Sequence, residues 1–191
     1  MAFPPTDRFN IADYFLEDRI GEGRGDRVAL RTAAEHLTYA QVSRLSNRFA
    51  SLVEGMGCVP GDRIMIALPD TPFFPGALFG ILKAGCQVVM VNPHLGSEQV
   101  DRFYQYVEPA LVLTTSGPAD VFGPPPGGQV LVLDGEHRGA LEAASEDFET
   151  VATRPEDPAI WLFSGGTTGQ PKGVVQSHRS FANTTERYGK G

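Results

Sequence analysis

The sequence has 191 residues, of which 41% are hydrophobic, and its formal net charge is −7. The apolar fraction is enough for a folded core, whereas the negative charge and the scattered Lys and Arg residues argue against binding to nucleic acid or to an anionic membrane surface. The longest apolar stretch, 75–91, is interrupted by Lys83 and Gln87, so no membrane-spanning helix is expected.

Two further features concern location. The first residues, Met1 to Pro5, lack the charged start and apolar centre of a signal peptide. Cys58 and Cys86 have no metal-ligand spacing, and Cys86 opens an apolar segment, which is typical of a small buried side chain. We therefore expect a reduced protein located in the cytoplasm.

The first half of the chain alternates between helical and extended patterns. Thr38 followed by Gln41 resembles a capping box, and hydrophobic residues then recur at helical spacing as far as Met56. The next segments are a strand at 63–68, an apolar helix at 73–84 and an apolar strand at 86–91.

The second half continues this alternation. Ser97 is the expected cap of a helix whose apolar face includes Val100 and Val107. The later segments are a strand at 110–115, a strand at 130–133, a helix at 136–144 and a polar connection at 150–158. Short links between alternating strands and helices imply right-handed crossovers. The expected fold is α/β, with a mostly parallel sheet flanked by helices.

A run of Ser, Gly and Thr follows an apolar strand near the end of the chain. The strand is at 159–163, the run is Ser164–Gly169, and Lys172 follows shortly after. Glycines let backbone N–H groups converge on an anion, the hydroxyls add donors, and the lysine adds a positive charge. This pattern predicts a loop that binds a polyphosphate.

The loop differs from the common P-loop. That motif needs adjacent Gly and Lys, then Ser or Thr at the start of a helix. Here Gln170 and Pro171 separate Gly169 from Lys172, and the valines that follow indicate a strand. The structural alternative is a flexible Gly/Thr hairpin with a solvated lysine, but an unbroken run between a buried strand and Pro-Lys-Gly favours ligand binding.

The segment Ser-Gly-Gly-Thr-Thr-Gly-Gln-Pro-Lys-Gly at 164–173 resembles the signature loop of the adenylate-forming (AMP-binding) superfamily. This superfamily includes acyl- and aryl-CoA ligases, luciferases and peptide-synthetase adenylation domains. Other short segments that resemble the family occur over nearly the whole chain, at 37–41, 60–63, 83–85 and 91–93. Segments 10–15, 21–28 and 161–163 are similar to those of benzoate-CoA ligase-like members. The family usually has Ser where Gly165 stands, so one hydroxyl is missing while the backbone donors remain.

The resemblance implies that 1–191 is the N-terminal part of the large domain of a longer enzyme. Within it, 1–149 would be the α/β portion, 150–158 a connection, and 159–191 the signature loop with the strand and helix after it. The family's ribose-binding Asp, metal-binding acid and late catalytic Lys would lie beyond Gly191. No catalytic residue is therefore assigned in this chain, and alone it is expected to be inactive.

The resemblance also implies a two-step reaction with ATP, Mg²⁺ and CoA. A carboxylate attacks the α-phosphate of ATP and gives an acyl-adenylate, and a thiol then takes the acyl group and releases AMP. In such enzymes the signature loop holds the β- and γ-phosphates, and Lys172 would support the departing pyrophosphate. The residues assigned to this role are Ser164, Gly165, Gly166, Thr167, Thr168, Gly169 and Lys172.

Other interpretations stay open at this point. The chain could be a non-catalytic nucleotide- or phosphate-binding module that kept the loop, or a P-loop phosphotransferase. The sequence also leaves open which acid is used, whether the acceptor is CoA or a carrier-protein thiol, and whether exposed apolar faces cause self-association. The remaining candidate residues are interpreted as structural. His178 is expected to be a surface or capping residue, His94 part of a turn, and Trp161 part of the core packing. The pairs Glu146-Asp147 and Glu156-Asp157 are expected to be solvated charges, and no metal ligand is assigned.

Overall fold

The computed structural model describes residues 7–134, 138–164 and 172–189. In chain order the elements are η1 (Asp13–Glu17), η2 (Ile20–Arg24), β1 (Val28–Arg31), β2 (His36–Thr38), α1 (Tyr39–Gly55), β3 (Arg63–Ala67), α2 (Phe73–Lys83), β4 (Gln87–Met90), α3 (Ser97–Val107), β5 (Leu111–Thr114), α4 (Ser116–Ala119), β6 (Gln129–Val132), α5 (Arg138–Ala143), β7 (Pro158–Ser164), β8 (Lys172–Ser177) and α6 (His178–Gly189). The two η elements are π-helical.

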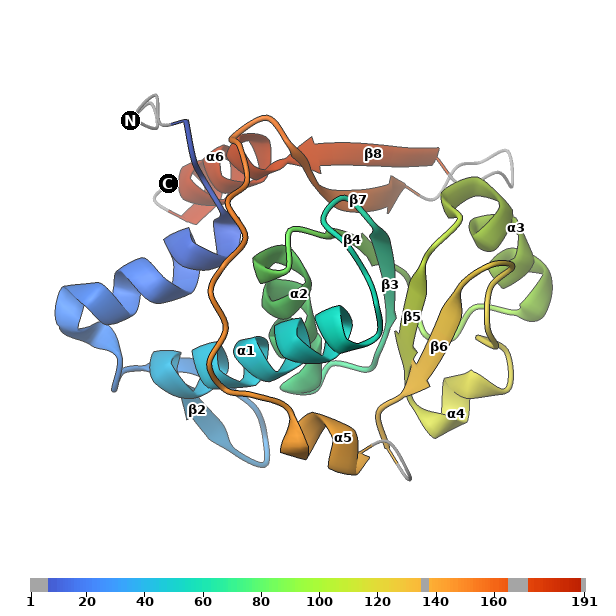
Figure 1. Cartoon of the computed structure of the whole chain (residues 1–191), viewed down its shortest axis with the longest axis horizontal. Helices are drawn as coiled ribbons and strands as arrows, with labels where there is room; N and C mark the ends of the chain where they lie inside the picture. Colours follow the sequence, from blue (N-terminus) through green and yellow to red (C-terminus); the bar gives the residue numbers. More distant parts are fainter. Residues whose placement is uncertain (1–6, 135–137, 165–171, 190–191) are drawn as a thin grey trace.

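Six of the strands in the described part of the chain form one sheet, in the order β6-β5-β3-β4-β7-β8 (Figure 1). All neighbouring pairs are parallel except β7 and β8, which are antiparallel. Helix α2 connects β3 to β4 on one side, and α3 returns the chain to β5 on the other side of β3. The predicted α/β fold with a mostly parallel sheet is confirmed.

Each face of the sheet has its own apolar layer, because successive side chains of a strand point to opposite faces. Ile64 and Ile66 of β3 belong to the layer that packs against α1 and α2, whereas Met65 and Ala67 belong to the layer under α3. All four side chains are fully buried. Strand β7 follows the same alternation, so Ile160 points toward the α1–α2 layer, while Trp161 and Phe163 point toward α3.

Helices α1 and α2 approach closely because α2 carries glycine at the contact. A Cβ added at Gly80 would lie 2.5 Å from Cβ of Phe49 and 2.6 Å from the carbonyl oxygen of Ser46, both in α1. Real Cβ atoms do not come so near, so a larger residue would have to push the two helices apart.

We therefore expect Gly80→Ala to destabilise the fold by about 2 kcal/mol, although alanine favours a helix more than glycine does. The matched control is Gly55→Ala in α1, where an added Cβ meets nothing within 4 Å. Urea unfolding followed by circular dichroism measures both variants. Equal stability of the two would contradict this account of the packing.

Several local features differ from the sequence-based expectation. The N-terminal segment forms π-helical turns at 13–17 and 20–24, which the sequence pattern did not predict. The hairpin of β1 and β2 was not predicted. The predicted cap Ser97 is instead the first residue of α3, and Gly96 is the N-cap, its N–H donating to the side chain of Gln99 at 3.1 Å.

Candidate phosphate-binding hairpin

The Ser/Gly/Thr-rich run connects β7 to β8 at the edge of the sheet. In this antiparallel pair, Ser164 lies opposite Lys172, and Phe163 lies opposite Gly173. The residues between them, 165–171, lie outside the described part of the chain, so the predicted phosphate contacts of Gly165, Gly166, Thr167, Thr168 and Gly169 remain predictions. The structure brings Ser164 and Lys172, the two ends of the predicted site, together at the base of the loop.

The position of this loop suits a ligand. Strand β7 is parallel to β4, so the chain leaves β7 at the edge of the sheet where the parallel strands have their carboxyl ends. Ligands of open α/β sheets bind outside this edge. Lys172 is exposed there, and its ammonium group is available to an anion that reaches the loop. The residue after the loop begins a strand rather than a helix, which contradicts the P-loop interpretation.

His178, directly after β8, was expected to be a surface or capping residue, and the surface position is wrong. Its side chain is 1% exposed, and its Nδ1 accepts a hydrogen bond from the backbone N–H of Ile11 at 3.1 Å. A ring that accepts through Nδ1 must be neutral, because both nitrogens of an imidazolium are donors. Burial lowers the pKa of His178 to about 4, although the nearby Asp157 acts in the opposite direction.

This geometry makes stability depend on pH. The pKa of His178 is about 4 in the folded chain and 6.5 as its ordinary value, so the unfolded chain binds more protons between these values. Stability should therefore rise with pH through this window and be lost on acidification. We expect a loss of about 2 kcal/mol between pH 7 and pH 4.5.

Urea unfolding at a series of pH values measures this effect. His178→Asn is the matched variant, because an Asn side-chain oxygen can accept the Ile11 N–H but does not titrate. This variant should show a shallower dependence over the same window. Identical pH profiles for the two proteins would exclude His178 as the source.

The other sequence candidates have structural roles. His94 is exposed in a turn, and its backbone N–H donates to Asn92 Oδ1 at 2.9 Å. Glu146 forms an ion pair with Arg48 at 2.8 Å, and Glu156 forms one with Arg179 at 2.9 Å. Cys86 is buried, as predicted, and burial raises the pKa of its thiol to about 12, which makes it unreactive at neutral pH.

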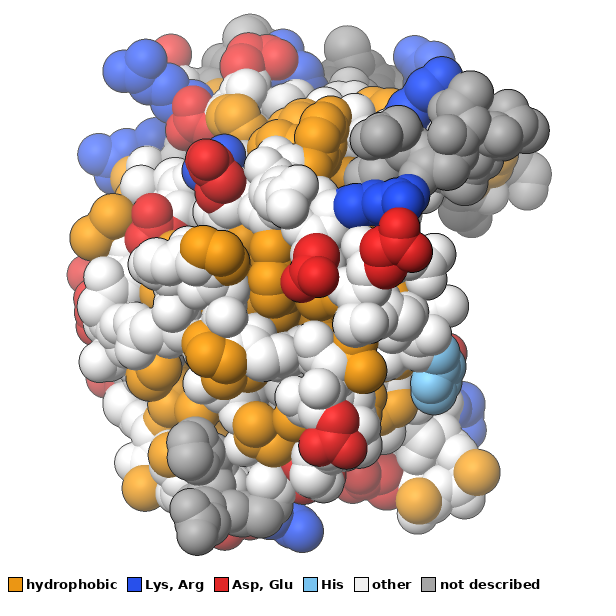
Figure 2. Space-filling model, turned by 90° about the vertical axis from the view of Figure 1, so that its right-hand side faces the viewer, with side chains coloured by type: hydrophobic (Ala, Val, Ile, Leu, Met, Phe, Trp, Pro, Cys, Tyr) orange, Lys and Arg blue, Asp and Glu red, His pale blue; other side chains and the backbone are white. Residues whose placement is uncertain are grey.

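Neither a metal-binding cluster nor a membrane-spanning helix occurs among the described residues. No group of three or more His, Cys, Asp or Glu side chains in ranges 7–134, 138–164 and 172–189 is placed to hold a metal ion. No helix within the same ranges is long and apolar enough to cross a membrane. On the face drawn in Figure 2, the Lys and Arg side chains lie in several separate places.

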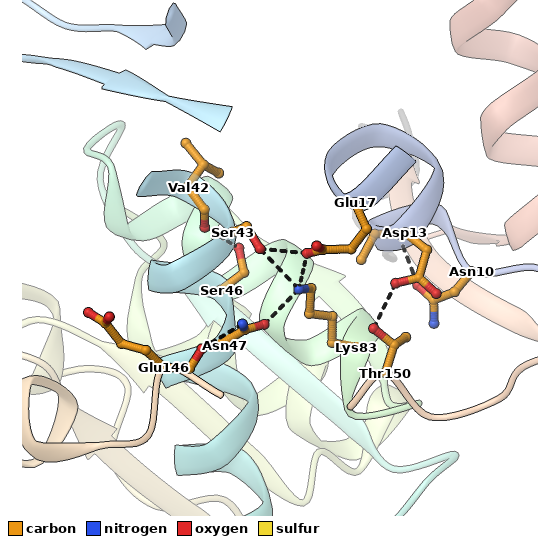
Figure 3. Close-up of polar contacts among 11 residues, drawn as sticks. Asn10, Asp13, Glu17, Val42, Ser43, Ser46, Asn47, Lys83, Glu146 and Thr150 are labelled. Carbon is orange, nitrogen blue, oxygen red and sulfur yellow. Dashed lines mark hydrogen bonds and ion pairs between the residues drawn. The ribbon is translucent and has the colours of Figure 1, made fainter. Parts of the chain in front are cut away.

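A buried lysine was not found from the sequence. Lys83 at the end of α2 is 1% exposed, and its Nζ lies 2.5 Å from Oε1 of Glu17 and 2.6 Å from Oδ1 of Asn47 (Figure 3). Ser43 Oγ donates to the same oxygen of Glu17 at 2.5 Å. Burial would raise the pKa of Glu17, but the hydrogen bonds from Lys83 and Ser43 hold it below its ordinary value. The cluster joins η1 to α1 and α2, away from the β7–β8 hairpin.

Comparison with known proteins places this arrangement in a family. The model of the AMP-binding enzyme family matches residues 17–190. The chain is 28% identical to the 3-hydroxybenzoate–CoA/4-hydroxybenzoate–CoA ligase of Thauera aromatica over 92% of its own length, and 28% identical to the benzoate–CoA ligase of the same organism over 99%. It is 35% identical over 76% of its length to the fatty acid–[acyl-carrier-protein] ligase ScoC of Streptomyces coeruleorubidus. The chain spans 36%, 38% and 29% of these three proteins, respectively.

Solved structures agree with the sequence comparisons. The benzoate CoA ligase of Burkholderia xenovorans LB400 superposes with a TM-score of 0.82 at 27% identity, over 95% of this chain and 37% of that one. MatB of Rhodopseudomonas palustris, solved with ATP bound, shares the fold with a TM-score of 0.83 at 24% identity, over 94% of this chain and 37% of that one.

The fold and the matched residues are those of the N-terminal part of adenylate-forming enzymes. The chain belongs to the AMP-binding enzyme family, and its homologues include benzoate- and hydroxybenzoate–CoA ligases as well as peptide synthetases.

Proposed function

We propose that this chain contributes the phosphate-binding hairpin of an enzyme that activates a carboxylic acid with ATP and joins it to the thiol of CoA. In the first step a carboxylate oxygen attacks the α-phosphorus, and the bond to the pyrophosphate oxygen breaks. In the second step the thiol attacks the acyl carbonyl, and AMP leaves with the electron pair of the broken bond. The observation that carries this proposal is the pairing of Ser164 with Lys172 at the base of a Gly-rich loop, at the carboxyl edge of a parallel sheet.

In this reaction the hairpin would stabilise the departing pyrophosphate. Negative charge develops on the pyrophosphate as it departs, and a fixed cation with backbone N–H donors stabilises that charge most when it is greatest. Lys172 supplies the cation, and the predicted loop residues 164–169 supply the donors. Mg²⁺ enters with ATP and neutralises phosphate charge, and we assign it no residue of this chain.

The names of the relatives support a choice of substrate class. The two Thauera ligases are named for benzoate and hydroxybenzoates, so aromatic carboxylic acids are the first candidates. The ScoC relative is named for transfer to an acyl carrier protein, which makes a carrier thiol the alternative acceptor to CoA. The complete active site is expected to need sequence beyond this chain, because the relatives are nearly three times as long.

The test uses the complete natural protein and the exchange of labelled pyrophosphate into ATP. Benzoate, 3-hydroxybenzoate, 4-hydroxybenzoate and a medium-chain fatty acid are compared with a reaction lacking acid. Exchange that depends on an added acid supports the proposal, and the most active acid is then offered CoA or a carrier protein. ATP binding without exchange for any acid would favour the non-catalytic binding module instead.

A further inference from the structure

Gly173, the neighbour of Lys172, lies under three aromatic rings. A Cβ added at Gly173 would lie 3.0 Å from Cε1 of Phe163, 3.2 Å from Cε1 of Tyr106 and 3.3 Å from Cε3 of Trp161. These distances are tighter than about nine in ten real Cβ contacts, so the rings pack closely against the strand backbone. A larger residue here would make these rings shift by a few tenths of an ångström, so the glycine serves close approach rather than an unusual backbone angle.

The rings come from two elements and contact one another edge to face. Tyr106 of α3 meets Trp161 and Phe163 of β7, each with centroids 6.3 Å apart and interplanar angles of 86° and 71°. Phe103 of α3 meets Phe163 at 4.7 Å and 81°. Such T-shaped pairs are favourable beyond the area that they bury. The indole Nε1 of Trp161 also donates to Oε1 of Gln87 at 2.8 Å, which fixes its orientation.

Apart from its pairing with β7, the start of the strand beneath these rings has few buried contacts. Within the described ranges, β8 pairs with β7 alone and forms the edge of the sheet. Val174 and Val175 are 53% and 42% exposed, so burial holds the start of β8 only weakly. Edge strands with few buried contacts open locally more easily than central strands. The ring contacts at Gly173 are therefore the main described packing next to Lys172.

We propose that Tyr106 and Gly173 are positioning residues for Lys172, an inference that rests on the function proposed above. The Tyr106 ring, held by α3, packs against the backbone of β8 at Gly173. This packing keeps the backbone of Lys172 in place opposite Ser164. Tyr106 is 49% exposed and acts through the strand rather than by touching the nucleotide. This role gives α3 an indirect part in ATP binding.

The first test compares steady-state kinetics of the complete natural protein and its variants. Tyr106→Ala should raise the KM for ATP roughly five- to tenfold, the low end of the effect expected from losing two edge-to-face contacts. The KM for the carboxylic acid should stay unchanged. Tyr106→Phe keeps the ring and should restore the KM for ATP. The matched control is Tyr188→Ala on α6, where the side chain is 87% exposed.

A double variant tests the contact itself. Gly173→Ala alone should raise the KM for ATP more than Tyr106→Ala does, because the new methyl group displaces the strand. Combining both changes should cost less than the product of the two effects, since the missing Tyr106 ring removes one of the three close contacts of the methyl group. Fully multiplicative effects would show that Tyr106 and Gly173 act independently and would overturn the proposal.

Hydrogen exchange separates this inference from the proposed function. In Tyr106→Ala, amides at 160–164 and 172–175 should exchange at least tenfold faster, while those of β3 remain protected. Unchanged exchange in these segments overturns the proposed bracing, whatever the kinetics show. A wild-type protein without carboxylate-dependent exchange of pyrophosphate refutes the proposed function, and the hydrogen-exchange result then decides the bracing alone. If Tyr106→Ala raises the KM for ATP no more than Tyr188→Ala does, while the wild type is active, only the inference fails.

Discussion

Replacing Lys172 by alanine in the complete protein is expected to slow adenylation by about 100-fold, measured as kcat/KM for ATP. Lys172 is the first residue of β8 and lies opposite Ser164, at the base of the loop. Its side chain carries the positive charge closest to the loop in sequence. Loss of this charge should affect the step in which pyrophosphate departs more than the binding of the acid. The KM for the carboxylic acid should therefore change little.

Two companion variants sharpen this prediction. Lys172→Arg keeps the charge but not the compact ammonium group, and it should retain more activity than alanine does. Arg138→Ala removes a cation that is 69% exposed on α5, and it should leave the rate unchanged. An unchanged rate of carboxylate-dependent pyrophosphate exchange in Lys172→Ala would refute the assigned role of Lys172.

The second large effect concerns stability. Lys83→Met should destabilise the fold by about 3 kcal/mol, because it leaves Glu17 and Asn47 without the partner that they share. This value is at the low end for a broken buried pair, since the Glu17 side chain is 39% exposed. Urea unfolding at pH 7 measures the change.

A double-mutant cycle shows whether the loss arises from the ion pair. Lys83→Met combined with Glu17→Met removes both charges. The double variant should recover part of the stability, because the Glu17 carboxylate is no longer left without its cationic partner. Arg138→Met breaks the exposed ion pair with Glu142 and should change stability by less than about 0.5 kcal/mol. A loss in Lys83→Met no larger than in Arg138→Met would contradict this view of the cluster.

The sequence predicted features whose causes are local. Thr38 and Gln41 form both hydrogen bonds of the predicted capping box, because the residues that make it are three positions apart. The predicted strands occur at nearly the expected bounds because each carries a dense apolar run. The family resemblance rested on the continuous segment 164–173, and the match to the AMP-binding family confirms that membership.

Features that depend on distant partners were missed. His178 and Ile11 are 167 positions apart, so no spacing rule connects them, and a histidine beside an arginine indicated a surface position. Lys83 interrupts an apolar helix and gave no sign of a buried site, because Glu17 and Asn47 are 66 and 36 positions away. The ring contacts at Gly173 likewise depend on Tyr106 of another helix. The loop itself was recognised by its composition, and its phosphate contacts stay predictions.

The most direct test of the central claim is to look for the acyl-adenylate itself. The complete protein is mixed with ATP, Mg²⁺ and the most active carboxylic acid in the absence of any thiol, and a single turnover is analysed by mass spectrometry. The account predicts an acid–AMP conjugate in amounts that match the enzyme, with an equal amount of pyrophosphate. Formation of ADP and an acyl phosphate, or of no adenylate with any acid of the panel, would contradict it.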